Sequence, residues 1–121
     1  MKYIALIYYD PDEVRQSGST MNEAYLDFTR RAMAAGVMAA GDALQPPSTA
    51  TTLKVRGGRT EMMDGPFAET KEQLGGYYVF DCPSLDEVLG WAEQIPGAKI
   101  GAIEVRPLMI FEPDPSKEGT S

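Results

Sequence analysis

The spacing of apolar residues along the chain predicts two amphipathic helices. Apolar side chains recur every three or four positions after Thr20 and again after Ser84, which is the spacing of one helix face. Each of these residues begins a capping box, whose hydroxyl and carboxylate satisfy free amide groups at a helix start. Gly36 supplies a left-handed stop for the first helix, and Pro96 ends the second. The residues predicted to face the core are Tyr25, Phe28, Ala32 and Ala35 in the first helix and Leu85, Val88, Leu89, Ala92 and Ile95 in the second.

Runs of apolar and β-branched residues predict strands between and around these helices. Gly57-Gly58 is a two-residue turn signal that joins two of them into a hairpin. With the hairpin set aside, the order is strand, helix, strand, strand, helix, strand. This order predicts an α+β fold, a ferredoxin-like split β-α-β arrangement with an inserted β-hairpin and both helices on one face of the sheet. The predicted strands cover residues 2–9, 37–44, 51–56, 59–63, 76–82 and 102–110.

Two of the predicted strands are apolar on both faces. In the strand 2–9 both alternating sets of side chains are apolar, and the same holds for Tyr77-Tyr78-Val79-Phe80. Two helices cover only one face of an antiparallel sheet. We therefore predict a homodimer in which two sheets pack face to face, a dimeric α+β barrel. The alternative is that the hairpin or the C-terminal tail folds over this face, although both are polar.

Length and charge limit the classes of protein to which the chain can belong. Its 121 residues are 43% hydrophobic and carry a formal net charge of −7. We predict one domain over residues 1–111, followed by a flexible acidic tail over residues 112–121. The acidic charge argues against direct binding to nucleic acid, and no apolar run is long enough to cross a membrane. A lone cysteine, Cys82, excludes an internal disulfide and fits a cytoplasmic location.

The chain contains no histidine. This absence excludes catalytic triads with an imidazole base and most zinc and iron sites, so neither a metal site nor a cofactor is expected. The acidic residues between Asp10 and Glu13 lack the glycine pattern of a calcium loop. We interpret them as part of a solvated loop.

The most unusual segment begins with Asp64-Gly65-Pro66-Phe67, a strong turn sequence that is followed by a cluster of charges. A rigid turn that delivers a carboxylate beside a lysine would support acid–base chemistry, because the lysine keeps the carboxylate ionised. The alternative, which residue types alone favour, is that the aspartate caps its own turn, the phenylalanine fills the core and the charges are solvated. The candidate catalytic residues are Asp64 and Lys71, and Phe67, Glu69 and Glu72 are candidate substrate contacts.

The same segment, continued to Tyr78, resembles the signature of the YCII-related family in the subgroup named for its DGPF tetrapeptide. The stretches 40–44 and 103–107 extend the resemblance over most of the chain. It implies a dimeric α+β barrel. Relatives include small-molecule enzymes such as muconolactone-type dehalogenases, and some members accompany, or are fused to, extracytoplasmic-function sigma factors. The better-studied branch carries a proposed histidine–aspartate pair, which cannot be transferred to a chain without histidine.

A second candidate cluster lies on the last predicted strand. Glu104 and Arg106 are two residues apart, so they share a face opposite the neighbours that turn toward the helices. Charges on that face must be paired or must line a wet cavity. Two interpretations are equally supported: a pocket in which Arg106 binds an anionic substrate group, or an ion pair between subunits. The candidate substrate contacts here are Glu104, Arg106, Asp42 from a strand predicted to be adjacent, and Tyr78, with Tyr8 as a further polar group.

Three functions follow from these patterns. The first is a small-molecule-binding protein or metal-independent acid–base enzyme with a pocket in each barrel. The second is a regulatory interaction module whose acidic surface suits a basic protein such as a sigma factor. The third is a dimer in which the motif is purely structural. The family resemblance favours the first function, and the sequence leaves open whether the chain is an enzyme.

Overall fold

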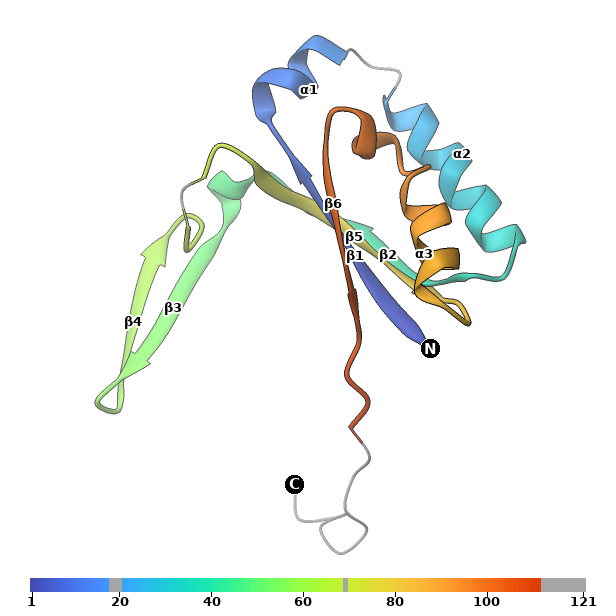
Figure 1. The fold of residues 1–121 in the computed structure, drawn as a ribbon. Helices are drawn as coiled ribbons and strands as arrows, with labels where there is room; N and C mark the ends of the chain where they lie inside the picture. The colour runs from blue at the N-terminus through green and yellow to red at the C-terminus, as the bar shows by residue number, and fades with distance from the viewer. Residues whose placement is uncertain (18–20, 69, 112–121) are drawn as a thin grey trace, which may run out of the picture.

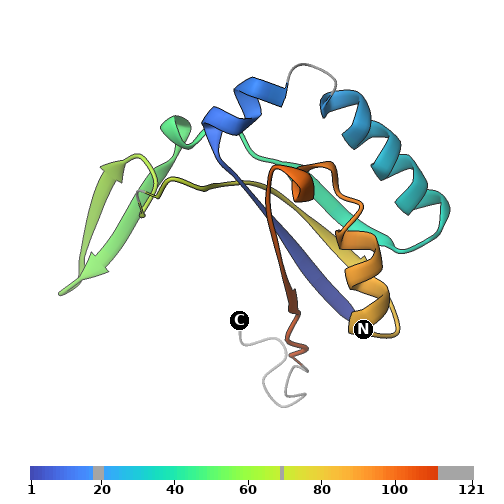
Figure 2. The ribbon, with the colours of Figure 1, turned by 45° about the horizontal axis from the view of Figure 1, so that its top comes forward.

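A four-stranded antiparallel sheet with two helices on one face forms the body of the protein. The computed structural model describes residues 1–17, 21–68 and 70–111. The strand order is β2-β5-β1-β6, and both ribbon views show α2 and α3 on the same side of the sheet (Figures 1 and 2). The predicted α+β, ferredoxin-like fold is confirmed. The elements of the body are β1 (Lys2–Tyr9), α2 (Met21–Ala34), β2 (Met38–Ala43), β5 (Gln73–Asp81), α3 (Leu85–Ala92) and β6 (Gly101–Pro107).

The two predicted helices form, but both end earlier than predicted: α2 ends at Ala34, which leaves Ala35 exposed, and α3 ends at Ala92 before the predicted stop at Pro96. Ser84 is the N-cap of α3, because its side chain accepts a hydrogen bond from the Glu87 amide at 3.3 Å. Gly36 follows α2 with a φ of 72°, the left-handed stop that the sequence predicts. The predicted cap Thr20 lies outside the described residues. Leu85 and Leu89 are nearly half exposed rather than buried, because α3 has little more than two turns and presents Val88 and Ala92 to the core.

A short helix, α1 (Pro11–Ser17), replaces the loop expected after the first strand. Asp10 caps it: Oδ1 of Asp10 accepts from the Asp12 amide at 2.9 Å, and the Asp10 carbonyl accepts from the Val14 amide at 3.1 Å. Proline at the first helical position and acidic residues in the first turn are typical of a helix start. The sequence therefore contained the signal for this helix. Two short 3₁₀ turns, η1 (Pro47–Thr49) and η2 (Pro96–Lys99), complete the connections.

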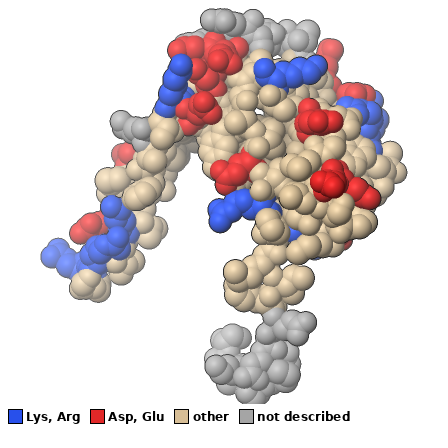
Figure 3. Space-filling view, in the orientation of Figure 1, with Lys and Arg blue, Asp and Glu red and all other residues tan. Residues whose placement is uncertain are grey.

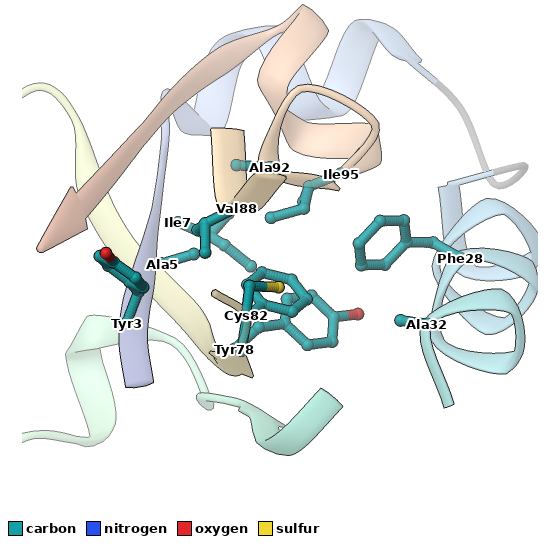
Figure 4. Packing of buried hydrophobic residues seen from close by; sticks show 11 residues of the cluster. Tyr3, Ala5, Ile7, Phe28, Ala32, Tyr78, Cys82, Val88, Ala92 and Ile95 are labelled. Carbon is teal, nitrogen blue, oxygen red and sulfur yellow. The ribbon is translucent and has the colours of Figure 1, made fainter. Parts of the chain in front are cut away.

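The hydrophobic core lies between the helices and one face of the sheet (Figure 4). Phe28 of α2 stands at its centre and makes edge contacts with Tyr78 at 5.2 Å and with Phe80 and Trp91 at 6.2 Å between ring centroids. Edge-to-face pairs of this kind stabilise by about 1 kcal/mol beyond the buried area. The fully buried members with the largest side chains are Phe28, Phe80, Ile95, Val88 and Cys82.

The predicted hairpin is a separate two-stranded sheet of β3 (Thr51–Arg56) and β4 (Arg59–Asp64), here called the hairpin arm. Gly57 and Gly58 have φ angles of 58° and 77°, which a two-residue type I′ turn requires. In both ribbon views the arm projects from the body on the side away from α2 and α3 (Figures 1 and 2). The arm extends outward from the body and does not fold back over the second face of the sheet (Figures 1 and 2).

The second face of the sheet, here called the open face, has an apolar centre and charged edges. Strand pairing places Leu6 between Tyr77 and Glu104, and places Asp42 beyond Tyr77. Ile4, Leu6, Tyr77 and Val79 are half-buried. None of the described helices lies over this face (Figures 1 and 2). The expected tail, residues 112–121, is outside the described part of the chain. Within that part, no helix is long and apolar enough to span a membrane.

Candidate functional site

A cleft of about 780 Å³ lies between α2 and the helix-facing side of β2 and β5. This volume is in the range of small-molecule sites. Leu26 and Thr29 of α2 form one wall, Met38 and Gly41 belong to β2, and Val14 closes the end near α1. Further lining residues are Ile7, Tyr9, Met21, Asn22, Tyr25, Leu44, Gly75, Gly76 and Tyr78.

Glycines on β2 and β5 allow close packing at the sheet side of the cleft. A Cβ atom on Gly41 would lie 2.6 Å from Cδ1 of Tyr78, and one on Gly76 would lie 2.9 Å from the Asp42 carbonyl oxygen. Real side chains do not approach so closely, so only glycine fits here without a shift of its neighbours. These glycines let the Tyr78 ring and the backbone of β2 pack closely at the sheet side of the cleft.

Three of the polar side chains that line the cleft carry hydroxyls with a defined hydrogen bond, and Asn22 and the edge residue Asp42 are further polar lining residues. Thr29 Oγ1 and the Tyr78 hydroxyl lie 2.8 Å apart and share one hydrogen bond, so one O–H of the pair remains available as a donor. The Tyr25 hydroxyl accepts from the Gly97 amide at 3.1 Å, which leaves its own hydrogen for another acceptor. Burial raises the pKa of Tyr25, more than the Gly97 hydrogen bond lowers it, so the phenol is neutral near pH 7. The cleft thus offers neutral donors to a ligand.

Asp42 and Tyr77 lie at the edge of this cleft but direct their side chains to the open face. Their neighbours Gly41 and Tyr78 face the cleft, and side chains alternate along a strand. The Tyr77 hydroxyl donates to Oδ2 of Asp42 at 2.9 Å, and this bond to a carboxylate raises the pKa of Tyr77. The predicted contacts Tyr78 and Asp42 are therefore close in space but separated by the sheet.

The structure does not bring the predicted catalytic pair together. Asp64 ends β4 and is exposed, paired in the ladder with Thr51. Lys71 Nζ lies 3.4 Å from Oδ2 of Asp10, and among the described residues no ion pair joins Lys71 to Asp64. Among the described residues, Asp10 is the charged side chain that is buried. Its ion pair with Lys71 links the segment after the hairpin arm to the start of α1.

The other motif residues lie at the root of the hairpin arm. Phe67 is 70% exposed and does not fill the core; its ring lies 5.0 Å from Nζ of Lys54 instead. Glu72 lines a second cavity of about 450 Å³ together with Tyr8 and Pro66. Glu69 lies outside the described residues.

Glu104 and Arg106 are exposed on the open face, as strand alternation predicts, while Ile103 and Val105 pack against the core. The expectation that the strand of Asp42 lies next to the strand of Glu104 and Arg106 is wrong within one chain. β2 and β6 are the two edges of the sheet, with β5 and β1 between them. The sequence predicts which face a strand residue occupies but does not specify the order of the strands.

Of the groups that give the cleft its chemistry, the sequence predicts Tyr78 as a substrate contact but not Tyr25 or Thr29. The apolar pattern places Tyr25 in the core, Thr29 belongs to no motif, and Gly41 appears only within the stretch 40–44 of the family resemblance. Only the contact of α2 with β2 and β5 assembles them, and no local signal reports that contact. Within the described ranges, no group of three or more cysteine, aspartate or glutamate side chains could hold a metal ion.

Comparison with known proteins identifies the family. The YCII-related domain matches residues 1–112. An uncharacterised protein of Rhizobium meliloti (strain 1021) is 46% identical over 86 residues, which is 69% of each chain. The fold is similar, with a TM-score of 0.54 and 18% identity, to that of 5-chloro-2-hydroxyhydroquinone dehydrochlorinase from Burkholderia phenoliruptrix, solved in complex with 2,5-dihydroxybenzoquinone. That alignment covers 90% of this chain and 94% of the dehydrochlorinase. The chain therefore belongs to the YCII-related domain family.

Proposed function

We propose that the protein binds a small ring compound with hydroxyl or keto oxygens in the cleft between α2 and the sheet. The observation that carries this proposal is the combination of a glycine-lined, aromatic cleft with unused phenol and hydroxyl donors from Tyr25 and the Thr29–Tyr78 pair. Flat apolar surface supplies affinity, and a few fixed donors orient the ligand. The dehydrochlorinase of similar fold, solved with a dihydroxybenzoquinone, supports this ligand class.

Binding is the function that this geometry supports best. The hydroxyls of Tyr25, Thr29 and Tyr78 donate to a ligand oxygen but are weak bases at neutral pH. A metal-independent acid–base reaction that uses Asp64 and Lys71 stays a prediction, as does a contact between substrate and Phe67, Glu69 or Glu72. The role of a regulatory partner of a sigma factor also stays a prediction.

A substitution on α2 tests the location of binding. Leu26 lines the cleft and is 65% exposed, so Leu26→Trp adds volume at its mouth without disturbing the core. Met33→Trp is the matched control, because Met33 lies on the same helix at 63% exposure and does not line the cleft. We expect calorimetric titration with 2,5-dihydroxybenzoquinone to show at least about tenfold weaker binding for Leu26→Trp, which is about 1.4 kcal/mol.

The expected result for Met33→Trp is an affinity equal to that of the wild-type protein. Equal affinity in all three proteins would place the ligand elsewhere and contradict the proposal. Equal losses in both variants would show a general effect of tryptophan on α2 and would also contradict it.

We also infer membership of the DGPF subgroup within the family. The tetrapeptide at residues 64–67 and its continuation to Tyr78 support this assignment. Residues 1–111 form the proposed single domain, with residues 112–121 as a tail. A cytoplasmic location is proposed on the basis of the lone Cys82, which is buried and whose pKa burial raises.

We further propose a homodimer formed by the open faces of two copies. Ile4, Leu6 and Val79 supply an apolar centre that neither α2 nor α3 covers. A two-fold axis parallel to the strands would bring the β2 edge of one copy over the β6 edge of the other. That arrangement would place Asp42 over the β6 strand of the other copy, level with Glu104 and two residues along the strand from Arg106, so an ion pair between subunits stays a prediction. The molar mass in solution tests this proposal independently of ligand binding.

A further inference from the structure

The hairpin arm lacks the support that an isolated hairpin normally needs. β3 and β4 pair only with each other, through a regular ladder from Thr51–Asp64 to Arg56–Arg59. Two further hydrogen bonds close the hairpin at its root, where the Gly65 amide donates to the Ala50 carbonyl at 2.8 Å and Thr52 Oγ1 donates to the Gly65 carbonyl at 2.8 Å. A two-stranded hairpin is marginally stable in water without a further layer.

One face of the hairpin arm is apolar and exposed. Leu53 and Met62 are directly opposite each other in the ladder, and Val55 lies two residues further along the same face. Their exposed fractions are 59%, 69% and 55%. These three side chains are adjacent, so they form a continuous apolar patch of the kind that binds another surface. The opposite face carries Lys54, whose ammonium lies over the ring of Phe67.

The charge of the arm is opposite to that of the remaining chain. Residues 51–64 contain three basic and two acidic side chains, a net charge of +1, so the rest of a chain with net charge −7 carries −8. Figure 3 shows Lys and Arg gathered at the far end of the arm, while Asp and Glu are spread over the body. A nucleic acid or an anionic membrane would be repelled by that body. A second copy of this chain offers the acidic surface that the arm complements.

We propose that the hairpin arm embraces a second copy of this chain, with Leu53, Val55 and Met62 packed on that copy and the basic tip against its acidic surface. This inference rests on the proposed homodimer. The arm projects on the side away from α2 and α3, which is also the side of the open face (Figures 1 and 2). A copy that packs on the open face is therefore within reach of the arm, and a reciprocal arm follows from two-fold symmetry.

Two neighbouring methionines provide a matched test. Met62→Asp puts a carboxylate on the proposed contact face, whereas Met63→Asp makes the same chemical change on the opposite face of the same strand. Both side chains are about half exposed or more, so neither change disturbs the core. Sedimentation equilibrium of the full chain measures the dimer dissociation constant. We expect Met62→Asp to raise this constant at least about tenfold and Met63→Asp to change it less than about threefold.

The result distinguishes failure of the arm contact from failure of the dimer. A dimeric wild-type protein whose dissociation constant responds equally to both substitutions would overturn the arm contact and leave the open-face dimer standing. A monomeric wild-type protein would overturn both. Hydrogen exchange of the Leu53 and Val55 amides provides the second readout, with protection that is lost on dilution below the dissociation constant.

Discussion

At the scale of single residues, the hydroxyl hydrogens that are not used within the protein determine which ligand groups the cleft can bind. Tyr25 and Thr29 come from one helix face, and Tyr78 comes from the strand below it. The Gly97 amide occupies an acceptor position of Tyr25 and leaves its hydrogen free to bond a ligand. Thr29 and Tyr78 similarly use one hydrogen between them. These groups are donors at neutral pH, which is why we propose a ligand with acceptor oxygens.

The raised pKa of Tyr25 predicts a specific pH dependence of stability. Unfolded Tyr25 ionises near its usual pKa of 10.0, whereas burial holds the folded phenol neutral to higher pH. Its contribution to stability is therefore complete below about pH 10 and is lost as the pH rises through the folded pKa. Above about pH 10, the unfolding free energy of Tyr25→Phe should therefore fall less steeply with pH than that of the wild-type protein. At pH 7 the variant should be less stable by about 1 kcal/mol, because the Gly97 amide loses its acceptor.

Urea unfolding of both proteins between about pH 7 and pH 11 measures this difference. The two proteins differ only at residue 25, so the difference between their stability curves reports on this hydroxyl. Parallel curves for the wild-type and Tyr25→Phe proteins across the alkaline range would contradict the buried position of this hydroxyl.

At the scale of elements, the periodicity of apolar residues predicts α2 and α3 and the order of strands along the chain, because amphipathic patterns report one buried face. It misses α1, although Asp10 and Pro11 form a typical helix start, because this helix has no clear apolar stripe. It also extended the buried stripe of the second helix to Leu85 and Leu89. Local patterns do not specify how much of a short helix its neighbours cover.

The candidate site was predictable only in part for a related reason. Strand alternation correctly predicted the face of Glu104 and Arg106. The order of the strands, which separates Asp42 from both residues, depends on pairings between distant segments. The cleft likewise depends on how α2 packs over β2. The sequence drew attention to the motif at residues 64–67, whereas the described cleft lies on the helix side of the sheet.

Two glycines on different elements test the packing at this cleft. Gly41→Ala places a Cβ atom against the buried Tyr78 ring, which also packs against Phe28. It should lower the free energy of unfolding by about 1–3 kcal/mol. Gly90→Ala is the matched control on α3, because its Cβ atom meets no atom within 4 Å and alanine favours a helix. It should raise the stability by about 0.5–1 kcal/mol.

Urea denaturation of both variants gives the comparison directly. The packing account of the cleft would be wrong if Gly41→Ala were as stable as the wild-type protein. A loss of stability in Gly90→Ala would instead contradict the open space around Gly90 in α3.

At the scale of the whole molecule, two kinds of surface remain without a partner. The open face has an apolar centre between charged edges, and the hairpin arm has an apolar face and a basic end. The open face and the hairpin arm both lie on the side of the sheet away from α2 and α3 (Figures 1 and 2). The cleft lies on the other side, between α2 and the sheet. We therefore expect association of two copies to leave the entrance of each cleft accessible to ligand.

The location of the ligand is the most direct test of the proposed function. Glycine amides resonate apart from most others in a proton–nitrogen correlation spectrum, and they sample both the cleft and distant parts of the fold. On titration with 2,5-dihydroxybenzoquinone, we predict saturable shifts of Gly41, Gly75 and Gly76, which line the cleft. The amide signals of Gly57 and Gly58 in the hairpin arm should not shift. Shifts confined to these two arm glycines, or no shift at any glycine up to millimolar ligand, would contradict the account.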